Sequence, residues 1–121
     1  MNPESYLYHY RAEVVSVYDG DTIRVNIDLG FGLTNRGSAG KGVSVRLHGI
    51  NAPELRGKEK VEGKKSQQAL EELLLGKTIT LKTIRDTTGK FGRYLGIILL
   101  EDGTNVNEWL ITEGLAKEAK Y

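Results

Sequence analysis

The chain has no cysteine, only two histidines and no long apolar run. Without cysteine it can form no disulfide, thiolate metal ligand or cysteine nucleophile, and its redox compartment stays undetermined. Two histidines, His9 and His48, are too few for a typical zinc site. Because no apolar stretch reaches the length of a bilayer, we expect no membrane association.

An excess of charge of one sign is also missing. The sequence has 17 basic and 16 acidic residues and a formal net charge of +1, which argues neither for nor against a polyanionic partner. The distribution is uneven, because residues 56–65 hold five basic and two acidic side chains, and residues 77–93 hold five basic and one acidic. The sequence therefore predicts local positive patches on a nearly neutral molecule.

The length of 121 residues suits a single domain, residues 1–121, with one modest core. Residues 1–9 lack a basic flank followed by an apolar run, so the chain as it stands shows no secretory signal. We therefore expect a cytoplasmic protein, unless a signal has been removed. We also expect a monomer.

The first half of the chain has the alternating pattern of half-buried strands. Apolar residues alternate with polar ones over residues 23–29 and again over 43–47, and residues 12–17 change parity midway, which predicts a strand with a bulge. Asp19 and Gly20 predict a tight turn into the second strand. Residues 30–42 contain five glycines, so we expect a long mobile loop there.

The second half alternates helix and strand signals. A helix is predicted from its apolar positions Val61, Ala69, Leu70, Leu73 and Leu74, with Gly76 as its terminator. Strands are predicted around residues 79–81 and, in a central position, over 94–100. Asn105 and Glu108 predict a capping box at the start of a short helix that Gly114 ends. This order predicts a mainly β (α+β) fold, a five-stranded OB-type barrel with two helices.

Two of the segments that could carry chemistry read DGDT (residues 19–22) and RLHGINAPE (residues 46–54). Asp19 is predicted to form the turn, whereas Asp21 is a candidate ligand for a hard divalent cation such as Ca²⁺. Arg46 has the opposite parity to its apolar neighbours, so we expect it to point away from the core. Pro53 biases Ala52 toward an extended conformation that aims its carbonyl outward. Glu54 follows, and it could take a proton from water held by a neighbouring metal.

A third segment, GKFGR, spans residues 89–93 and ends in Arg93. A basic hairpin edge is a common device against aggregation. It can also supply a planar guanidinium for a bidentate phosphate contact, which lysine cannot match. Two arginines and a metal around one phosphodiester would stabilise the extra negative charge of its transition state, and losing one such donor typically costs roughly a hundredfold or more in rate.

Together with VNEWLITEGLAK (residues 106–117), these three segments resemble the staphylococcal (thermonuclease-type) nuclease family over residues 10–121. The resemblance implies an OB barrel whose calcium-dependent members hydrolyse DNA and RNA and leave 3′-phosphate ends. It implies that calcium is held by three residues, Asp21, Asn51 and the carbonyl of Ala52. It further implies that Glu54 activates water while Arg46 and Arg93 grip the phosphate. The residues implied to contact the nucleotide are Lys90, Phe91 and Tyr121.

The chain departs from the family pattern at several positions. Asn51 stands where well-studied members have aspartate, so we expect weaker metal affinity unless another oxygen compensates. Phe91 lacks the hydroxyl of the family's tyrosine, and Lys120, beside Tyr121, stands where another tyrosine is expected. The sequence also stops before the family's final helix, so we expect that part of the core to be absent or supplied by further sequence.

Two functions are compatible with this pattern. The first is a Ca²⁺-dependent nuclease that hydrolyses DNA, RNA or both. The second is a noncatalytic OB module that binds nucleic acid or protein, and Asn51 motivates it because it weakens the metal site. The first is favoured because the chain keeps Asp21, Arg46, Glu54 and Arg93, whereas loss of catalysis should also remove arginines or the glutamate.

Overall fold

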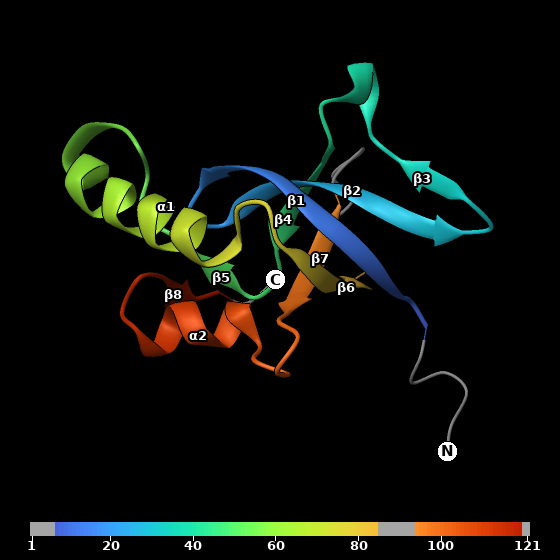
Figure 1. Cartoon of the computed structure of the whole chain (residues 1–121). Helices are drawn as coiled ribbons and strands as arrows, with labels where there is room; N and C mark the ends of the chain where they lie inside the picture. Colours follow the sequence, from blue (N-terminus) through green and yellow to red (C-terminus); the bar gives the residue numbers. More distant parts are fainter. Residues whose placement is uncertain (1–6, 85–93, 120–121) are drawn as a thin grey trace.

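The computed structural model describes residues 7–84 and 94–119. Five strands close into a barrel (Figure 1). They are β1 (His9–Asp19), β2 (Thr22–Gly30), β4 (Val43–Leu47), β6 (Thr78–Ile84) and β7 (Leu95–Leu99). Their order is β1-β6-β7-β4-β2, and a pairing between β1 and β2 closes the ring. The predicted five-stranded OB-type barrel with two helices is therefore confirmed.

Strand β1 reaches both of its neighbours because it is long and irregular. Its first half pairs with β6, and most of its length pairs with β2. The β1–β2 register shifts between Val14 and Ser16, at the place where the apolar parity of the sequence changes. The predicted bulge is thus confirmed, and it bends the strand so that the sheet can curl.

The glycine-rich stretch 30–42 contains some regular structure. Strand β3 (Leu33–Asn35) extends the sheet as a hairpin beside β2, and a 3₁₀ turn, η2, covers Ser38–Gly40. The mobility of this segment stays a prediction.

Helix α1 (Lys60–Leu74) lies along β1, after the 3₁₀ turn η3 (Gly57–Glu59). It ends as predicted, with Gly76 in the left-handed region at φ 76°. The predicted buried face is wrong at Val61, which is 70% exposed. Gly63 and Ser66 are buried instead, because the first turns of the helix pack against backbone rather than against apolar side chains.

Helix α2 (Val106–Thr112) covers the bottom of the barrel. Its N-terminus is capped as predicted, because Oδ1 of Asn105 accepts a hydrogen bond of 3.1 Å from the backbone N–H of Glu108. Buried Asn107 connects the helix to the sheet: it donates to the carbonyls of His48 (2.9 Å) and Gly96 (3.0 Å) and accepts from the N–H of Ile98 (3.1 Å).

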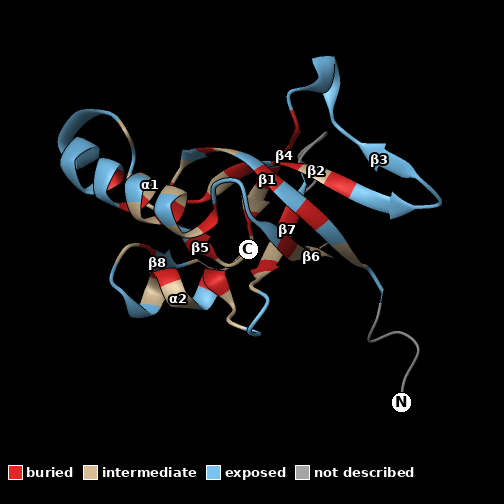
Figure 2. Cartoon of the chain, in the orientation of Figure 1, coloured by how far each residue is buried: buried red, intermediate tan, exposed pale blue. Residues whose placement is uncertain are grey.

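A short two-stranded sheet completes the structure. Strand β5 (Ile50–Asn51) pairs antiparallel with β8 (Lys117–Glu118), so the segment after α2 lies against the segment after β4. The buried residues form one apolar cluster inside the barrel and beneath both helices (Figure 2). In the part of the chain described, no helix has the length and apolarity needed to cross a membrane.

Candidate active site

Three segments that are distant in sequence meet at a cleft of about 630 Å³. They are the β1–β2 turn, the β4–β5 segment with the turn that follows it, and the stretch after α2. Five of the predicted site residues line this cleft: Asp21, Arg46, Asn51, Ala52 and Glu54. The barrel thus brings together the acidic and basic groups that the sequence separates.

The β-sheet register places Arg46 next to Asp21. Arg46 pairs with Thr22 across the β2–β4 ladder, and the N–H of Leu47 donates to the carbonyl of Asp21 at 2.7 Å. Val45 and Leu47 are buried in the core, so Arg46 points away from the core as predicted. Its side chain is 22% exposed and reaches the cleft.

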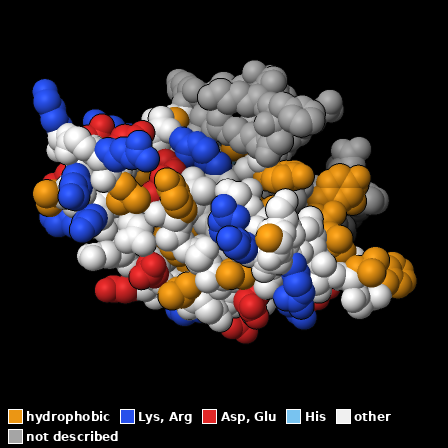
Figure 3. All heavy atoms as spheres, turned by 90° about the horizontal axis from the view of Figure 1, so that it is seen from above, with side chains coloured by type: hydrophobic (Ala, Val, Ile, Leu, Met, Phe, Trp, Pro, Cys, Tyr) orange, Lys and Arg blue, Asp and Glu red, His pale blue; other side chains and the backbone are white. Residues whose placement is uncertain are grey.

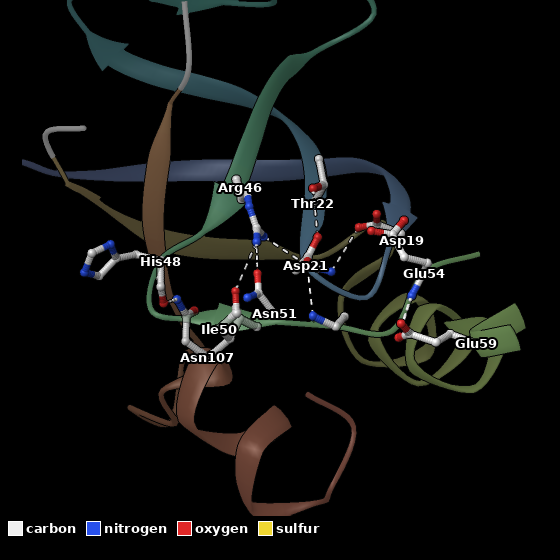
Figure 4. Close-up of polar contacts among 11 residues, drawn as sticks. Asp19, Asp21, Thr22, Arg46, His48, Ile50, Asn51, Glu54, Glu59 and Asn107 are labelled. Carbon is white, nitrogen blue, oxygen red and sulfur yellow. Dashed lines mark hydrogen bonds and ion pairs between the residues drawn. The ribbon is translucent and has the colours of Figure 1, made fainter. Parts of the chain in front are cut away.

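The carboxylate of Asp21 is surrounded by donors (Figure 4). Its Oδ2 lies 3.0 Å from Nη1 of Arg46 and accepts a 2.9 Å hydrogen bond from the N–H of Ala52. Its Oδ1 accepts a 3.2 Å bond from the hydroxyl of Thr22. Charged acceptors bind such donors more strongly than neutral ones do, so these contacts hold the β1–β2 turn against the segment after β5.

Arg46 lies among oxygen atoms from two segments. Its Nη2 donates to the carbonyl of Ile50 at 3.3 Å and also to Oδ1 of Asn51. Its buried Nη1 makes the ion pair with Asp21, but no acceptor among the described residues lies in line with its N–H bonds. Nη1 is therefore held by the charge of Asp21 and is closed to solvent in this arrangement.

Asp19 is part of the same constellation. As predicted for a turn residue, its Oδ1 accepts a 3.0 Å hydrogen bond from the N–H of Asp21. Burial raises the pKa of Asp19 to about 6, and the hydrogen bond and negative charge of the Asp21 side chain act in the same direction. Burial, and to a smaller extent the neighbouring Asp21, thus favour the neutral form of this carboxyl.

Glu54 lies on the loop between β5 and η3 and is exposed. Its N–H donates to Oε2 of Glu59 at 3.3 Å, and both side chains line the cleft. Helix α1 supports this loop closely: a Cβ added to Gly63 would lie 2.1 Å from the Glu54 carbonyl oxygen. The position of Glu54 therefore depends on the absence of a side chain at residue 63.

The remaining predicted site residues lie outside the described residues. They are Lys90, Phe91, Arg93 and Tyr121. Their roles stay predictions.

Sequence reasoning missed several contributors to the cleft. Gly20 lies against Ser66 and Ala52, and Gly63 lies against the loop of Glu54. For the helix, the sequence signal of this close contact is the pair of small residues Gly63 and Ser66, three positions apart. Gly20 was predicted as a turn residue and not as a contact of the helix. Lys117 also lines the cleft, because the β5–β8 pairing brings it there, and no local pattern indicates this.

The oxygen atoms here are of the kind that bind hard cations. Asp21 offers a carboxylate, Asn51 an amide oxygen and Ala52 a backbone carbonyl, and all three residues line the cleft. The described residues contain no cluster of three His, Cys, Asp or Glu side chains that could hold a metal ion. The donor set thus fits calcium in its chemistry, with amide and backbone oxygens in place of further carboxylates.

Comparison with known proteins agrees with this geometry. A family model described as staphylococcal nuclease homologue matches residues 44–121. The chain is 36% identical over 103 residues to a protein of Escherichia coli O157:H7 named as an uncharacterized endonuclease, covering 85% of this chain and 57% of that relative. It is 31% identical over 120 residues to a micrococcal nuclease of Shigella flexneri, covering 93% of this chain and 60% of that relative.

The chain thus spans less than two thirds of the length of these relatives. The family match covers nearly all of β4 and every described element from β5 to β8, and it includes Arg46 and Glu54. Barrel, cleft and family match together show that the chain belongs to the staphylococcal nuclease homologue family.

Proposed function

We propose that this protein is a Ca²⁺-dependent nuclease that hydrolyses phosphodiester bonds in DNA, RNA or both. The observation that carries the proposal is the convergence of Asp21, Arg46 and Glu54 on one cleft. Relatives named as endonuclease and micrococcal nuclease support the same reaction class.

In the proposed reaction, water attacks phosphorus and the P–O5′ bond breaks. The leaving 5′ oxygen takes a proton from solvent and becomes a hydroxyl, and a 3′-phosphate end remains. Glu54, an exposed carboxylate that lines the cleft, accepts the proton of the attacking water, which is the role that the family resemblance implies for it. The guanidinium of Arg46, which lines the cleft, donates to a phosphate oxygen and stabilises the charge that develops there. Arg93 would supply a second guanidinium, as the family resemblance implies.

The ion would be held by Asp21, Asn51 and the carbonyl of Ala52. When bound, calcium would neutralise phosphate charge and lower the pKa of a bound water. Lys90, Phe91 and Tyr121 are proposed to contact the nucleotide. Phe91 can stack on a base but cannot donate a hydrogen bond.

The proposal is tested by cleavage of single-stranded DNA and of RNA with calcium and with chelator. We expect cleavage only with calcium, and we expect Glu54→Gln to lower the rate by roughly a hundredfold or more because the proton acceptor is lost. Glu62→Gln, on the exposed face of α1, is the matched control and should leave the rate unchanged. Calcium-independent cleavage, or full activity of Glu54→Gln, would contradict the mechanism.

A noncatalytic binding module is the second candidate. The observation that favours it is the ion pair of Arg46 with Asp21, which offsets the one carboxylate charge among the proposed metal ligands. Calorimetric titration of calcium into the protein separates the two candidates, because a pure binding module need show no metal heat.

A further inference from the structure

The guanidinium of Arg46 occupies the oxygen atoms that a cation would need. It lies 3.0 Å from the Asp21 carboxylate and donates to Oδ1 of Asn51 and, at 3.3 Å, to the carbonyl of Ile50. Two of these three oxygens belong to the proposed calcium ligands. The arginine thus makes contacts that a divalent ion would otherwise make.

The charges at the site make the Arg46 guanidinium and a divalent ion compete for the same oxygens. The Asp21 side chain is only 12% exposed, so water screens its interactions poorly. A guanidinium 3.0 Å from one of its oxygens repels any second cation that approaches the same carboxylate. Asn51 adds no negative charge that could hold both cations together. An ion can therefore use Oδ2 of Asp21 and Oδ1 of Asn51 only if the guanidinium moves away from them, whereas Oδ1 of Asp21 contacts the hydroxyl of Thr22 instead.

We propose that Arg46 is the resident cation of this cleft, and that a divalent ion must displace it from Asp21 and Asn51 to bind. The displaced guanidinium stays on β4 at the edge of the cleft, where substrate phosphate is proposed to lie. The inference deepens the proposed nuclease function and rests on it for the identity of the ion.

Displacement couples the two ligands of the site. An ion that releases Arg46 prepares the guanidinium for phosphate, and a phosphate that holds Arg46 vacates the oxygens for the ion. By linkage, each ligand then tightens the other to the same extent. Ion binding in the absence of phosphate should be weak, because it must first break the existing contacts.

Calorimetry with calcium chloride alone tests the proposal on the intact chain. We expect Arg46→Gln to bind calcium about tenfold more tightly than the parent, because removal of the neighbouring positive charge ends the competition. Arg24→Gln is the matched control. Arg24 lies on the adjacent strand, is exposed and donates to the carbonyl of Gly42 at 3.4 Å, so its loss should leave calcium affinity unchanged.

A second readout is the melting temperature with chelator and with calcium. The rise on adding calcium should be larger for Arg46→Gln than for the parent. Arg46→Lys keeps a charge without the forked donors, and its affinity should fall between the two. If Arg46→Gln does not fold, the calcium affinity of Arg46→Lys tests the proposal by itself. An affinity no tighter than that of the parent would then overturn the proposal.

Unchanged, weaker or absent calcium binding in folded Arg46→Gln overturns the displacement model. Because no readout uses cleavage, the result is distinguishable from failure of the nuclease proposal. If Arg46→Gln binds calcium more tightly but the parent chain shows no cleavage, the displacement proposal stands. Only the proposed nuclease function is then rejected.

Discussion

Asp19 is a residue whose burial and neighbouring charge oppose ionisation. Its pKa of about 6 lies above the ordinary value of 3.8, so the folded chain binds this proton more tightly than the unfolded chain does. The free energy of unfolding should therefore fall as the pH rises from 3.8 to about 6. The ionised carboxylate then destabilises the fold at neutral pH, when no cation is present.

Asp19→Asn should stabilise the metal-free protein above pH 6. The amide keeps an oxygen to accept from the N–H of Asp21 but carries no charge. We expect a gain on the order of 1 kcal/mol, after discounting for partial exposure, and no gain below pH 3.8. Urea unfolding in chelator at both pH values measures the difference.

Asp28→Asn is the control for the Asp19→Asn variant. Asp28 makes the same local bond to a backbone N–H two residues on, that of Gly30 at 2.9 Å, but it is exposed. Its replacement should change stability little at either pH. A gain for Asp19→Asn that is equal at both pH values would contradict the electrostatic explanation.

At the scale of elements, helix α1 acts as the support of the site. Its small residues Gly63 and Ser66 let the helix approach the Glu54 loop and the β1–β2 turn closely, and the hydroxyl of Ser66 donates to the carbonyl of Leu115 at 2.5 Å. The sequence predicted the position of this helix and its end. It did not predict that Gly63 and Ser66 are buried, because the helix was predicted from the spacing of its apolar residues, and neither glycine nor serine contributes to that pattern.

Gly63→Ala tests the support. In an open helix position alanine would stabilise by about 1 kcal/mol, but here its Cβ would lie 2.1 Å from backbone oxygen. We expect a net loss of about 1–3 kcal/mol from overpacking, and lower cleavage activity because the Glu54 loop must shift. Thermal unfolding and cleavage rate are the measurements.

Gln68→Ala is the matched control, since Gln68 lies on the same helix and is exposed. It should change stability by less than about 0.5 kcal/mol. A stabilised Gly63→Ala variant with full activity would show that the loop does not depend on close helix contact.

At the scale of the whole molecule, charge is local although the total is +1. Lys and Arg side chains gather over the α1 side in the view from above (Figure 3). Lys64 and Lys65 are exposed on this helix, which packs against the loop that carries Glu54. This surface is suited to hold a nucleic-acid backbone beside the cleft.

Replacement of Lys64 and Lys65 by Gln should weaken binding of single-stranded DNA. If each lysine contacts one phosphate, the slope of log K against log salt should become shallower by about 1–2. Fluorescence anisotropy with calcium omitted measures this. Replacement of Arg36 and Lys41 by Gln, two exposed positions on the segment after β2, removes the same charge and should leave the slope unchanged. Equal effects of the two pairs would contradict a specific surface.

The sequence by itself determined the five barrel strands, the bulge, the cap at Asn105 and the type of barrel, because these depend on local parity, turn chemistry and spacing. It did not predict the short strands β3, β5 and β8. It also brought Asp21, Arg46 and Glu54 to attention through their motifs. Only the tertiary structure decided that the guanidinium of Arg46 lies against Asp21 and Asn51, and that Gly63 supports the Glu54 loop. These contacts join residues through strand register and helix packing, and local sequence does not encode such distances.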